Sequence, residues 1–322
     1  HANLASNVGS ILEYLDLRAS DSIVNILPFF YSYGNSILHT HLAAGARVVL
    51  EKSMMYPAQV LNSMARESVT GFSGVPSTYS ILLNRVDLTQ FDLSSLRYMT
   101  QAGGPMAPAD IQRLTSLLPE VRFFVMYGQT EASARLSYLP PDRLFDKLGS
   151  IGVAIPGVTI EIHDQDGRKT EPHQVGELCA RGDNIMQGYW MNDEMTRQVI
   201  RAGWLCTGDL GYHDDDGYLY IVGRATDMIK SGAHRISPKD IEEVVLEVDG
   251  VAEVVAVGMP DALLGQAIKL IVVKRPGSEL DAKTIQRHCK SNLAAYKIPK
   301  LIEFSESIPR TSSGKVQRFK LQ

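Results

Sequence analysis

The chain has 322 residues, of which 44% are hydrophobic and 21% are charged, with a formal net charge of −4; this is the composition of an ordinary soluble protein with room for two domains. No apolar run reaches the about 18 residues that a membrane-spanning helix needs, and no signal-peptide pattern is visible, so we expect no membrane span. Its three cysteines, Cys179, Cys206 and Cys289, are too few for a disulfide framework and lack metal-ligand spacing, so a cytoplasmic location is expected.

Residues 1–135 alternate short apolar runs with amphipathic stretches, which predicts a parallel sheet covered by helices. The chain opens in a helix-like pattern, and further helices are expected at Tyr56–Glu67 and Pro108–Leu118. Ligands of such sheets bind at the carboxyl ends of the strands, so the segments that follow the strands are candidate sites. The predicted strands are Ser22–Leu27, Arg47–Leu50, Gly71–Gly74, Arg97–Thr100 and Arg122–Met126.

Residues 136–222 have a different sequence pattern. Pieces that favour strands, at Val158–His163, Gly176–Ala180 and Tyr218–Ile221, are separated by turns rich in Gly, Asp and Pro. This spacing predicts a β-rich subdomain, a small and strongly bent antiparallel sheet or a barrel-like module.

Residues 223–322 predict a small, mobile α+β domain at the C-terminus, so the whole chain is expected to be an α/β protein with a large N-terminal domain. This part carries 16 Lys and Arg against 12 Asp and Glu, a net charge of +4, whereas the remainder carries −8. A basic domain suits a phosphate-bearing partner. The alternative is that the positive charge only keeps a small domain soluble. The expected helices and strands are Ser237–Glu247, Val251–Met259, Ala267–Lys274, Asp281–Leu293 and Leu301–Phe304.

Two glycines follow the strand predicted at Arg97–Thr100. In the segment Gln101–Pro105, Gly103 and Gly104 would let a flat ligand approach the backbone closely. A strand-to-helix turn that needs a positive φ is the simpler explanation when the segment is taken alone.

The segment Tyr127–Glu131 follows the next predicted strand. Tyr127 offers a stacking face, Thr130 a hydroxyl, and Glu131 a hard oxygen ligand suited to Mg²⁺. An aromatic ring, a hydroxyl and a carboxylate at a strand end fit a nucleotide site. The alternative is a solvent-facing loop with a helix cap.

Two more polar segments lie further along the chain. Trp204–Leu210 places Asp209 after a glycine turn, where a carboxylate can accept hydrogen bonds from both ribose hydroxyls, or can simply anchor the turn. Pro309–Lys315 is rich in Ser and Gly and presents Lys315, which suits a phosphate or carboxylate but also fits a frayed tail.

The segment Gly223–Glu243 reads GRATDMIKSGAHRISPKDIEE. It combines a polar turn, a glycine-broken loop at Ser231–Arg235 that carries a cation, and a helix start at Ser237. Pro238 stands at the first helical position, with acidic residues in the first turn. The plain alternative is a strand–loop–helix connection with a solvated charged face.

Five motifs, taken in order, resemble the adenylate-forming superfamily of acyl-CoA synthetases, luciferases and peptide-synthetase adenylation domains. They are LPFFYSYG, YGQTE, TGDL, GRATDMIKSGAHRISPKDIE and PRTSSGKVQR, and the resemblance spans His1–Lys320. It implies a two-step ligase reaction: a carboxylate attacks the α-phosphate of ATP to give acyl-AMP and pyrophosphate, and a thiol, usually of coenzyme A, then displaces AMP. Both steps need developing charge to be neutralised.

The resemblance also implies roles for the residues of the first step. Thr130 would touch the phosphates and Glu131 would hold Mg²⁺, while Lys315 would bridge the reacting carboxylate and the α-phosphate. The groups expected around the nucleotide and the acyl carbonyl are Gly103, Gly104, Tyr127, Gly128, Gln129, Asp209 and Arg224, with Tyr127 against adenine and Asp209 and Arg224 on the ribose.

For the second step the resemblance implies a swing of the C-terminal domain about a hinge at Asp227. Ser231, Gly232 and Ala233 would then line the pantetheine tunnel, with Arg235 near the nucleotide end of coenzyme A.

Two departures from the family matter. The Ser/Thr/Gly-rich phosphate loop that the family has before the residues matching His1–Leu4 does not occur in this sequence, nor does the family's first subdomain. Since that loop cradles the β- and γ-phosphates, we expect the chain alone to be nearly inactive in adenylation, with the missing segment as a possible separate partner. The second departure is Tyr31, where many acyl-CoA synthetases have a histidine near the acyl tunnel; tyrosine keeps an aromatic gate but does not titrate near neutral pH.

The acid is expected to be a fatty or aryl carboxylate. Relatives that activate amino acids place an aspartate in the segment matching Phe29–Gly45, which contains no acidic residue here. An ammonium buried without a partner would cost several kcal/mol. Gly74–Tyr79 would add an apolar to mildly polar wall, so the acyl pocket is expected at Tyr31, Val75 and Gly104.

Two alternatives stay open. The acyl group could pass to the pantetheine of an acyl or peptidyl carrier protein instead of coenzyme A. A different class is a non-catalytic AMP- or acyl-binding fragment that descends from the enzyme. No nucleic-acid partner is expected.

Overall fold

A computed structural model describes residues 1–311 and 316–321, so Lys315 lies outside the described residues. The chain forms two compact units. The first consists of His1–Thr207 with Tyr212–Ile221, and the second of Gly208–Gly211 with Val222–Gln322. The further division of residues 1–222 into two subdomains stays a prediction. Among the described residues no helix combines the length and apolarity that crossing a membrane requires.

The first unit is built on a seven-stranded sheet with the order β2-β1-β3-β4-β5-β6-β7. The first five strands are parallel to one another, as the alternating pattern predicts, whereas β6 pairs antiparallel with β5 and β7 pairs antiparallel with β6. The α/β class is therefore confirmed. The strands are β1 (Ser22–Asn25), β2 (Arg47–Leu50), β3 (Gly71–Gly74), β4 (Tyr98–Gln101), β5 (Arg122–Tyr127), β6 (Ser137–Leu139) and β7 (Val153–Ala154).

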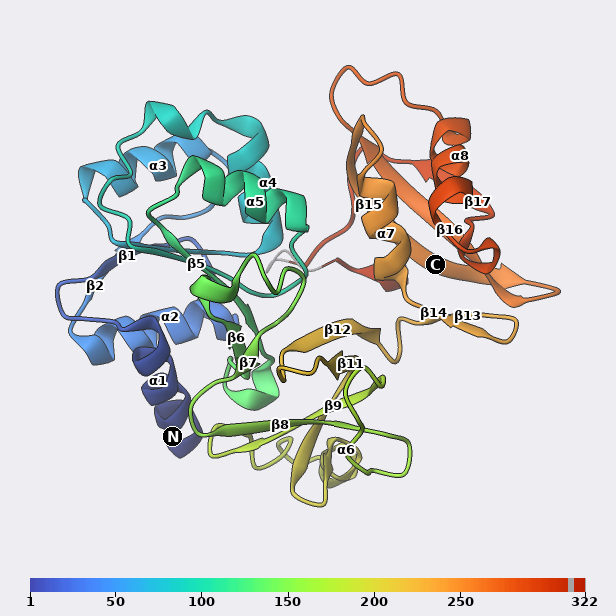
Figure 1. Cartoon of the computed structure of the whole chain (residues 1–322). Coiled ribbons are helices and arrows are strands. Elements are labelled where there is room, and N and C mark those ends of the chain that lie inside the picture. Colours follow the sequence, from blue (N-terminus) through green and yellow to red (C-terminus); the bar gives the residue numbers. More distant parts are fainter. Residues whose placement is uncertain (312–315, 322) are drawn as a thin grey trace. The chain divides into compact units, whose positions relative to one another are not determined.

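Helices cover both faces of this sheet (Figure 1). Successive strand residues point to opposite faces, so Phe123 packs in the cluster under α3–α5 while Phe124 packs in the cluster under α1 and α2. Proline at the first helical position begins α3, α4 and α5, where its missing N–H has no helical partner to lose. The helices are α1 (Ala2–Leu15), α2 (Ser32–Ala44), α3 (Pro57–Arg66), α4 (Pro76–Arg85) and α5 (Pro108–Leu117).

Helices α2 and α4 were not predicted as helices from the sequence. In α2, Ser36, Thr40 and His41 are buried among the apolar residues, so the 3.6-residue hydrophobic period is interrupted. The buried hydroxyls are satisfied inside the helix, since Thr40 Oγ1 donates to the carbonyl of Ser36 at 2.8 Å. Helix α4 begins at Pro76, within the segment expected only to form a pocket wall.

The remaining β-rich part is a sheet with the order β10-β11-β9-β8, and β12 pairs with β11. Strands β8 and β9 are antiparallel, as expected. A helix, α6, interrupts the strands where none was predicted. The elements are β8 (Val158–His163), β9 (Gly176–Gly182), α6 (Asp193–Val199), β10 (Ile200–Arg201), β11 (Trp204–His213) and β12 (Leu219–Arg224).

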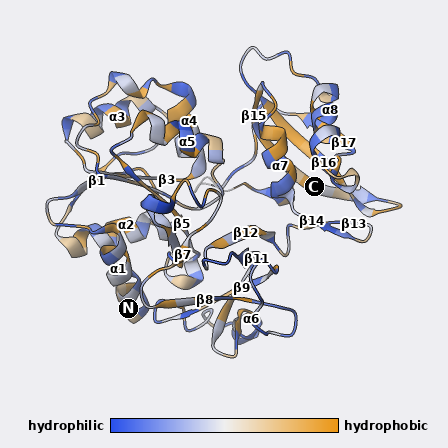
Figure 2. Cartoon of the chain, viewed as in Figure 1, coloured by the Kyte–Doolittle hydropathy of each residue, from blue (hydrophilic) through white to orange (hydrophobic). Residues whose placement is uncertain are grey.

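The second unit has the predicted order helix, strand, strand, helix, strand, preceded by a short hairpin. Its sheet order is β14-β13-β16-β15, with β17 parallel to β16. Figure 2 shows the hydrophobic stretches of β15 and β16, and their buried residues pack against Ile241 of α7 and Ile285 of α8. The elements are β13 (Ile229–Ser231), β14 (His234–Ile236), α7 (Pro238–Leu246), β15 (Val251–Asp261), β16 (Gly265–Lys274), α8 (Ala282–Asn292) and β17 (Leu301–Phe304).

Candidate functional site

The turn after β4 brings together three residues singled out from the sequence. Gly103 has φ 90°, and a Cβ there would lie 2.6 Å from the hydroxyl of Tyr31 and 3.2 Å from Cγ1 of Val75. Glycine is therefore required both by the backbone conformation and by the close approach of Tyr31. Tyr31 and Val75, both expected in the acyl pocket, meet at this turn. Gly104 follows it and is exposed.

The residues after β5 form a short helical turn, Thr130–Ala132. The Thr130 hydroxyl donates to Oγ of Ser32, the first residue of α2, at 3.4 Å. The Glu131 carboxylate accepts a hydrogen bond from the phenol of Tyr189 at 2.7 Å. Burial and the neighbouring Glu131 carboxylate raise the pKa of Tyr189 to about 12, so the phenol stays protonated as the donor.

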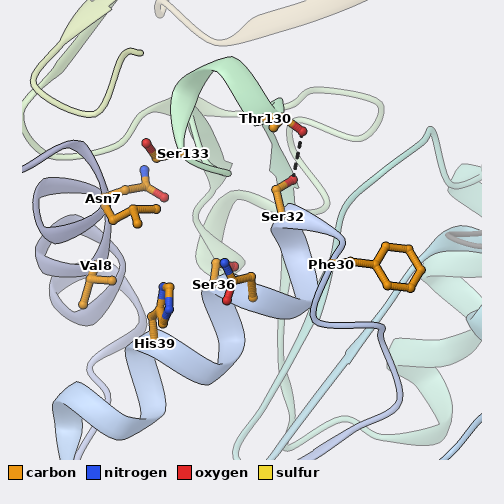
Figure 3. A pocket seen from close by; sticks show the side chains of 10 residues that line it. Asn7, Val8, Phe30, Ser32, Ser36, His39, Thr130 and Ser133 are labelled. Atoms are coloured by element: carbon orange, nitrogen blue, oxygen red, sulfur yellow. Dashed lines mark hydrogen bonds between the residues drawn. The ribbon is translucent and has the colours of Figure 1, made fainter. Parts of the chain in front are cut away.

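A pocket of about 210 Å³ opens beside Thr130 (Figure 3). Thr130 and Ser32 face each other across one side of it, and Asn7 and Val8 of α1 line the other. Helix α2 begins at this pocket with no side-chain cap on its first turn, so its N–H groups and the positive end of its dipole favour an anion. The lining residues are Leu4, Asn7, Val8, Phe30, Ser32, Asn35, Ser36, His39, Thr130 and Ser133.

Ser32 and Tyr189 were missed in the sequence, although each contacts a residue that was singled out. Ser32 lies within the LPFFYSYG motif, whereas Tyr189 stands 58 residues after Glu131. No local spacing links those two positions. Packing alone requires glycine at position 128, because a Cβ there would overlap the carbonyl of Ala134. Tyr127 ends β5 and is half-buried, as is Gln129.

In the second unit, Asp209 and Arg224 form an ion pair. Nε of Arg224 lies 2.8 Å from Oδ1 of Asp209, and the Asp209 side chain is only 7% exposed. The expectation that Asp209 follows a glycine turn is wrong, because Gly208 and Asp209 lie inside β11. Gly208 still has φ 75°, and its carbonyl accepts from the amide of Ala225 at 3.0 Å, which places Asp209 beside the start of the Arg224–Asp227 turn.

The expected glycine-broken loop at Ser231–Arg235 is instead the tip of a hairpin. Ser231 pairs with His234 and Lys230 with Arg235 across β13 and β14. Gly232 takes the left-handed conformation that the tight turn needs, with φ 59°. Ser231 is buried, whereas Gly232, Ala233 and Arg235 are exposed.

The hinge candidate Asp227 belongs to a charged cluster around Arg318. Arg318 binds both carboxylate oxygens of Glu242, at 2.6 and 3.0 Å, and its Nε lies 3.9 Å from Oδ2 of Asp227. Arg310 pairs with Val316 in an isolated bridge and its guanidinium binds Glu253 at 2.6 Å. The described residues on both sides of positions 312–315 are therefore anchored to this unit.

Residues 1–190 match the family described as AMP-binding enzyme, and residues 240–315 match the AMP-binding enzyme C-terminal domain. The chain belongs to the AMP-binding enzyme family. The resemblance drawn from the five motifs is thereby confirmed. The fold agrees as well: o-succinylbenzoate CoA synthetase MenE from Bacillus subtilis, solved with the acyl-adenylate intermediate OSB-AMP, superposes with a TM-score of 0.89 at 31% identity, covering 100% of this chain and 64% of that one.

Curated members of the AMP-binding enzyme family also align along nearly the whole chain. The oxalate–CoA ligase of Arabidopsis thaliana is 35% identical over 320 residues, 98% of this chain and 62% of that protein. The long-chain-fatty-acid–CoA ligase of Bacillus subtilis (strain 168) is 31% identical over 327 residues, 100% of this chain and 58% of that protein. The chain thus spans about three fifths of the length of these relatives.

Proposed function

We propose that the protein activates a carboxylic acid with ATP as an acyl adenylate and transfers the acyl group to the thiol of coenzyme A. The observation that carries this proposal is the Thr130–Glu131 turn, where a hydroxyl and a carboxylate held by Tyr189 stand beside a pocket and the amino end of α2. The names of the aligned relatives, which are CoA ligases, support the same reaction.

The turn after β5 would serve the first step. Thr130, Ser32 and the first N–H groups of α2 would donate to phosphate oxygens, which spread negative charge as the α-phosphate is attacked. Glu131 would hold Mg²⁺, which neutralises charge on the phosphates when bound, and the Tyr189 phenol would keep its carboxylate in one orientation. Tyr127 would stack on adenine, and Gly103 would admit the acyl carbonyl.

The second unit would supply charge and the acceptor site. Asp209 would accept hydrogen bonds from the ribose hydroxyls while Arg224 holds its carboxylate in one orientation. Lys315 would neutralise the reacting carboxylate in the first step. In the second step a turn about Asp227 would bring the exposed hairpin tip at Gly232 and Ala233 to the thiol.

The acid is proposed to be a fatty or aryl carboxylate. Tyr31 and Val75 contribute an aromatic and an aliphatic surface at the Gly103 turn, and Phe29–Gly45 carries no acid to pair an α-ammonium group. An amino acid would therefore bury its ammonium without a partner at a cost of several kcal/mol.

The test incubates the product of the complete reading frame with ATP, Mg²⁺, coenzyme A and a panel of fatty, aryl and amino acids. AMP and acyl-CoA are expected to appear together, and only with fatty or aryl acids. Acyl-AMP without acyl-CoA would contradict the proposed acceptor and favour a carrier-protein pantetheine or an amine. No AMP from any acid, in a protein that still binds AMP by calorimetry, would favour a non-catalytic AMP-binding module.

The contact between Tyr189 and Glu131 gives a first prediction. Tyr189→Phe removes a hydrogen bond to a carboxylate, a contact with a net value of about 1.5 kcal/mol or more. We expect the affinity for Mg²⁺–ATP to fall about tenfold, with AMP affinity measured without metal unchanged. Titration calorimetry of both ligands checks this, and Tyr56→Phe, at a residue 68% exposed, is the matched control. An equal loss for both ligands would contradict a role through the metal ligand.

A further inference from the structure

Two cysteines that are 27 residues apart in the sequence meet inside the first unit. Cys179 lies in β9 and Cys206 in β11, neighbouring strands of one sheet, and their Sγ atoms are 3.1 Å apart. The hydroxyl of Thr207 donates to the carbonyl of Leu178 at 2.9 Å and fixes the two strands at this level. Both side chains are buried, at 1% and 7% exposure. The spacing of the three cysteines in the sequence did not indicate this pair.

A guanidinium sits beside the pair. Glu177 stands two residues before Cys179, hence on the same face of β9, and binds the side chain of Arg201 in β10. The Cys179 thiol, which donates to Sγ of Cys206, and the nearby Arg201 guanidinium both lower the pKa of Cys206. The same hydrogen bond and burial raise the pKa of Cys179. Of the two sulfurs, Cys206 is therefore the one favoured to lose its proton and to become the thiolate, which is the nucleophilic form.

A metal ion is the competing occupant of this place, because a Glu177 oxygen and the two sulfurs lie within 4.8 Å of one another. The Arg201 guanidinium already neutralises Glu177 and lies against Cys206, so a divalent cation would meet a fixed positive charge. Structural zinc sites also take four protein ligands, whereas the described residues offer three here.

We propose that Cys179 and Cys206 are a redox-active thiol pair that closes to an inter-strand disulfide on reaction with hydrogen peroxide. The Cys206 thiolate attacks one peroxide oxygen, the O–O bond breaks, and the leaving hydroxide is protonated to water, which leaves a sulfenic acid on Cys206. The sulfur of Cys179 then attacks Sγ of Cys206, the S–O bond breaks, and hydroxide leaves with the Cys179 proton as a second water. Two thiols are oxidised by two electrons, and one peroxide is reduced to two waters.

The geometry suits this closure. The sulfurs need to approach by only about 1 Å to reach bonding distance, and the strands that carry them are already neighbours. Strand β11 continues from Cys206 to Asp209, so the disulfide would tie the strand that carries the proposed ribose ligand to β9. The proposal concerns the thiols alone and holds whether or not the proposed ligase activity does.

The test treats the reduced chain with hydrogen peroxide, alkylates the remaining thiols under denaturing conditions, and maps the peptides by mass spectrometry. The expected product has lost two hydrogens, carries one alkyl group at Cys289 and yields one peptide pair linked through Cys179 and Cys206. Cys289→Ser should form the same link, whereas Cys179→Ser should stop at a sulfenic acid on Cys206 that dimedone traps.

Arg201→Met removes a positive charge that lowers the pKa of Cys206, so the fraction of Cys206 present as thiolate near neutral pH should fall. Disulfide formation is expected to slow about three- to tenfold, because a rise of one pKa unit lowers the thiolate fraction up to about tenfold. Arg181→Met removes a guanidinium elsewhere on β9 and should leave the rate unchanged. Oxidation at Cys289 without the Cys179–Cys206 link would overturn the proposal. So would one equivalent of zinc in the untreated protein that Cys206→Ser abolishes.

Discussion

The Gly152→Ala variant is expected to lose about 2–5 kcal/mol of stability in the first unit, or to fail to fold. Gly152 has φ 82°, and a Cβ there would overlap the backbone of Tyr138 and Leu139 in the antiparallel strand β6. Backbone cannot move aside as a side chain can, so overpacking adds about 1–3 kcal/mol to about 1–2 kcal/mol of conformational strain. Gly152 also bridges to Leu219 of β12, hence a shift there disturbs a second sheet.

Gly149→Ala is the matched control, because Gly149 has φ 84° but nothing lies within 4 Å of an added Cβ. It should cost only the strain, about 1–2 kcal/mol. Urea unfolding followed by the fluorescence of Trp190 and Trp204, both in the first unit, compares the two variants. Equal losses of unfolding free energy in both variants would show that the close approach of position 152 to Tyr138 does not contribute to the destabilisation.

Elements that depend on local patterns were predictable from the sequence. The parallel strands follow short apolar runs, and α3, α5 and α7 each begin with proline at the first helical position. Helix α2 was not predicted because buried polar residues interrupt the apolar pattern of its inner face. Their hydroxyls are hydrogen-bonded within the helix, which makes their burial possible. The hairpin at Ser231–Arg235 was not predicted because a glycine turn between two three-residue strands has the composition of a loop.

The parts of the candidate site that the sequence could not supply are pairs of distant residues. Thr130 meets Ser32, and Glu131 meets Tyr189, only because β5 ends and α2 begins at one edge of the sheet and the β-rich part folds back on it. Cys179 and Cys206 become neighbours only through the order of β9 and β11. Motif spacing identifies a residue's type and its strand, but tertiary packing selects the partner that orients it.

The second large effect is expected at Asp209. Asp209→Asn replaces one acceptor oxygen by an NH₂ group, so the side chain loses its charge and can no longer accept from Arg224 and from both ribose hydroxyls. Hydrogen bonds to a charged group contribute about 1.5–3 kcal/mol each. AMP affinity measured by titration calorimetry is therefore expected to fall about 100-fold, which corresponds to about 2.7 kcal/mol.

Deoxynucleotides separate this role from a general loss of charge. The unchanged chain should bind AMP at least tenfold more tightly than 2′-deoxy-AMP, since a ribose hydroxyl is missing from the second ligand. Asp209→Asn should lose this preference, because it loses the acceptor that reads the hydroxyl. Asp240→Asn, which removes another carboxylate paired with a cation of the same unit, Lys297 at 2.5 Å, should keep both affinity and preference. If Asp209→Asn still preferred AMP over 2′-deoxy-AMP, another residue would bind the ribose hydroxyl, and the role of Asp209 would be to pair with Arg224.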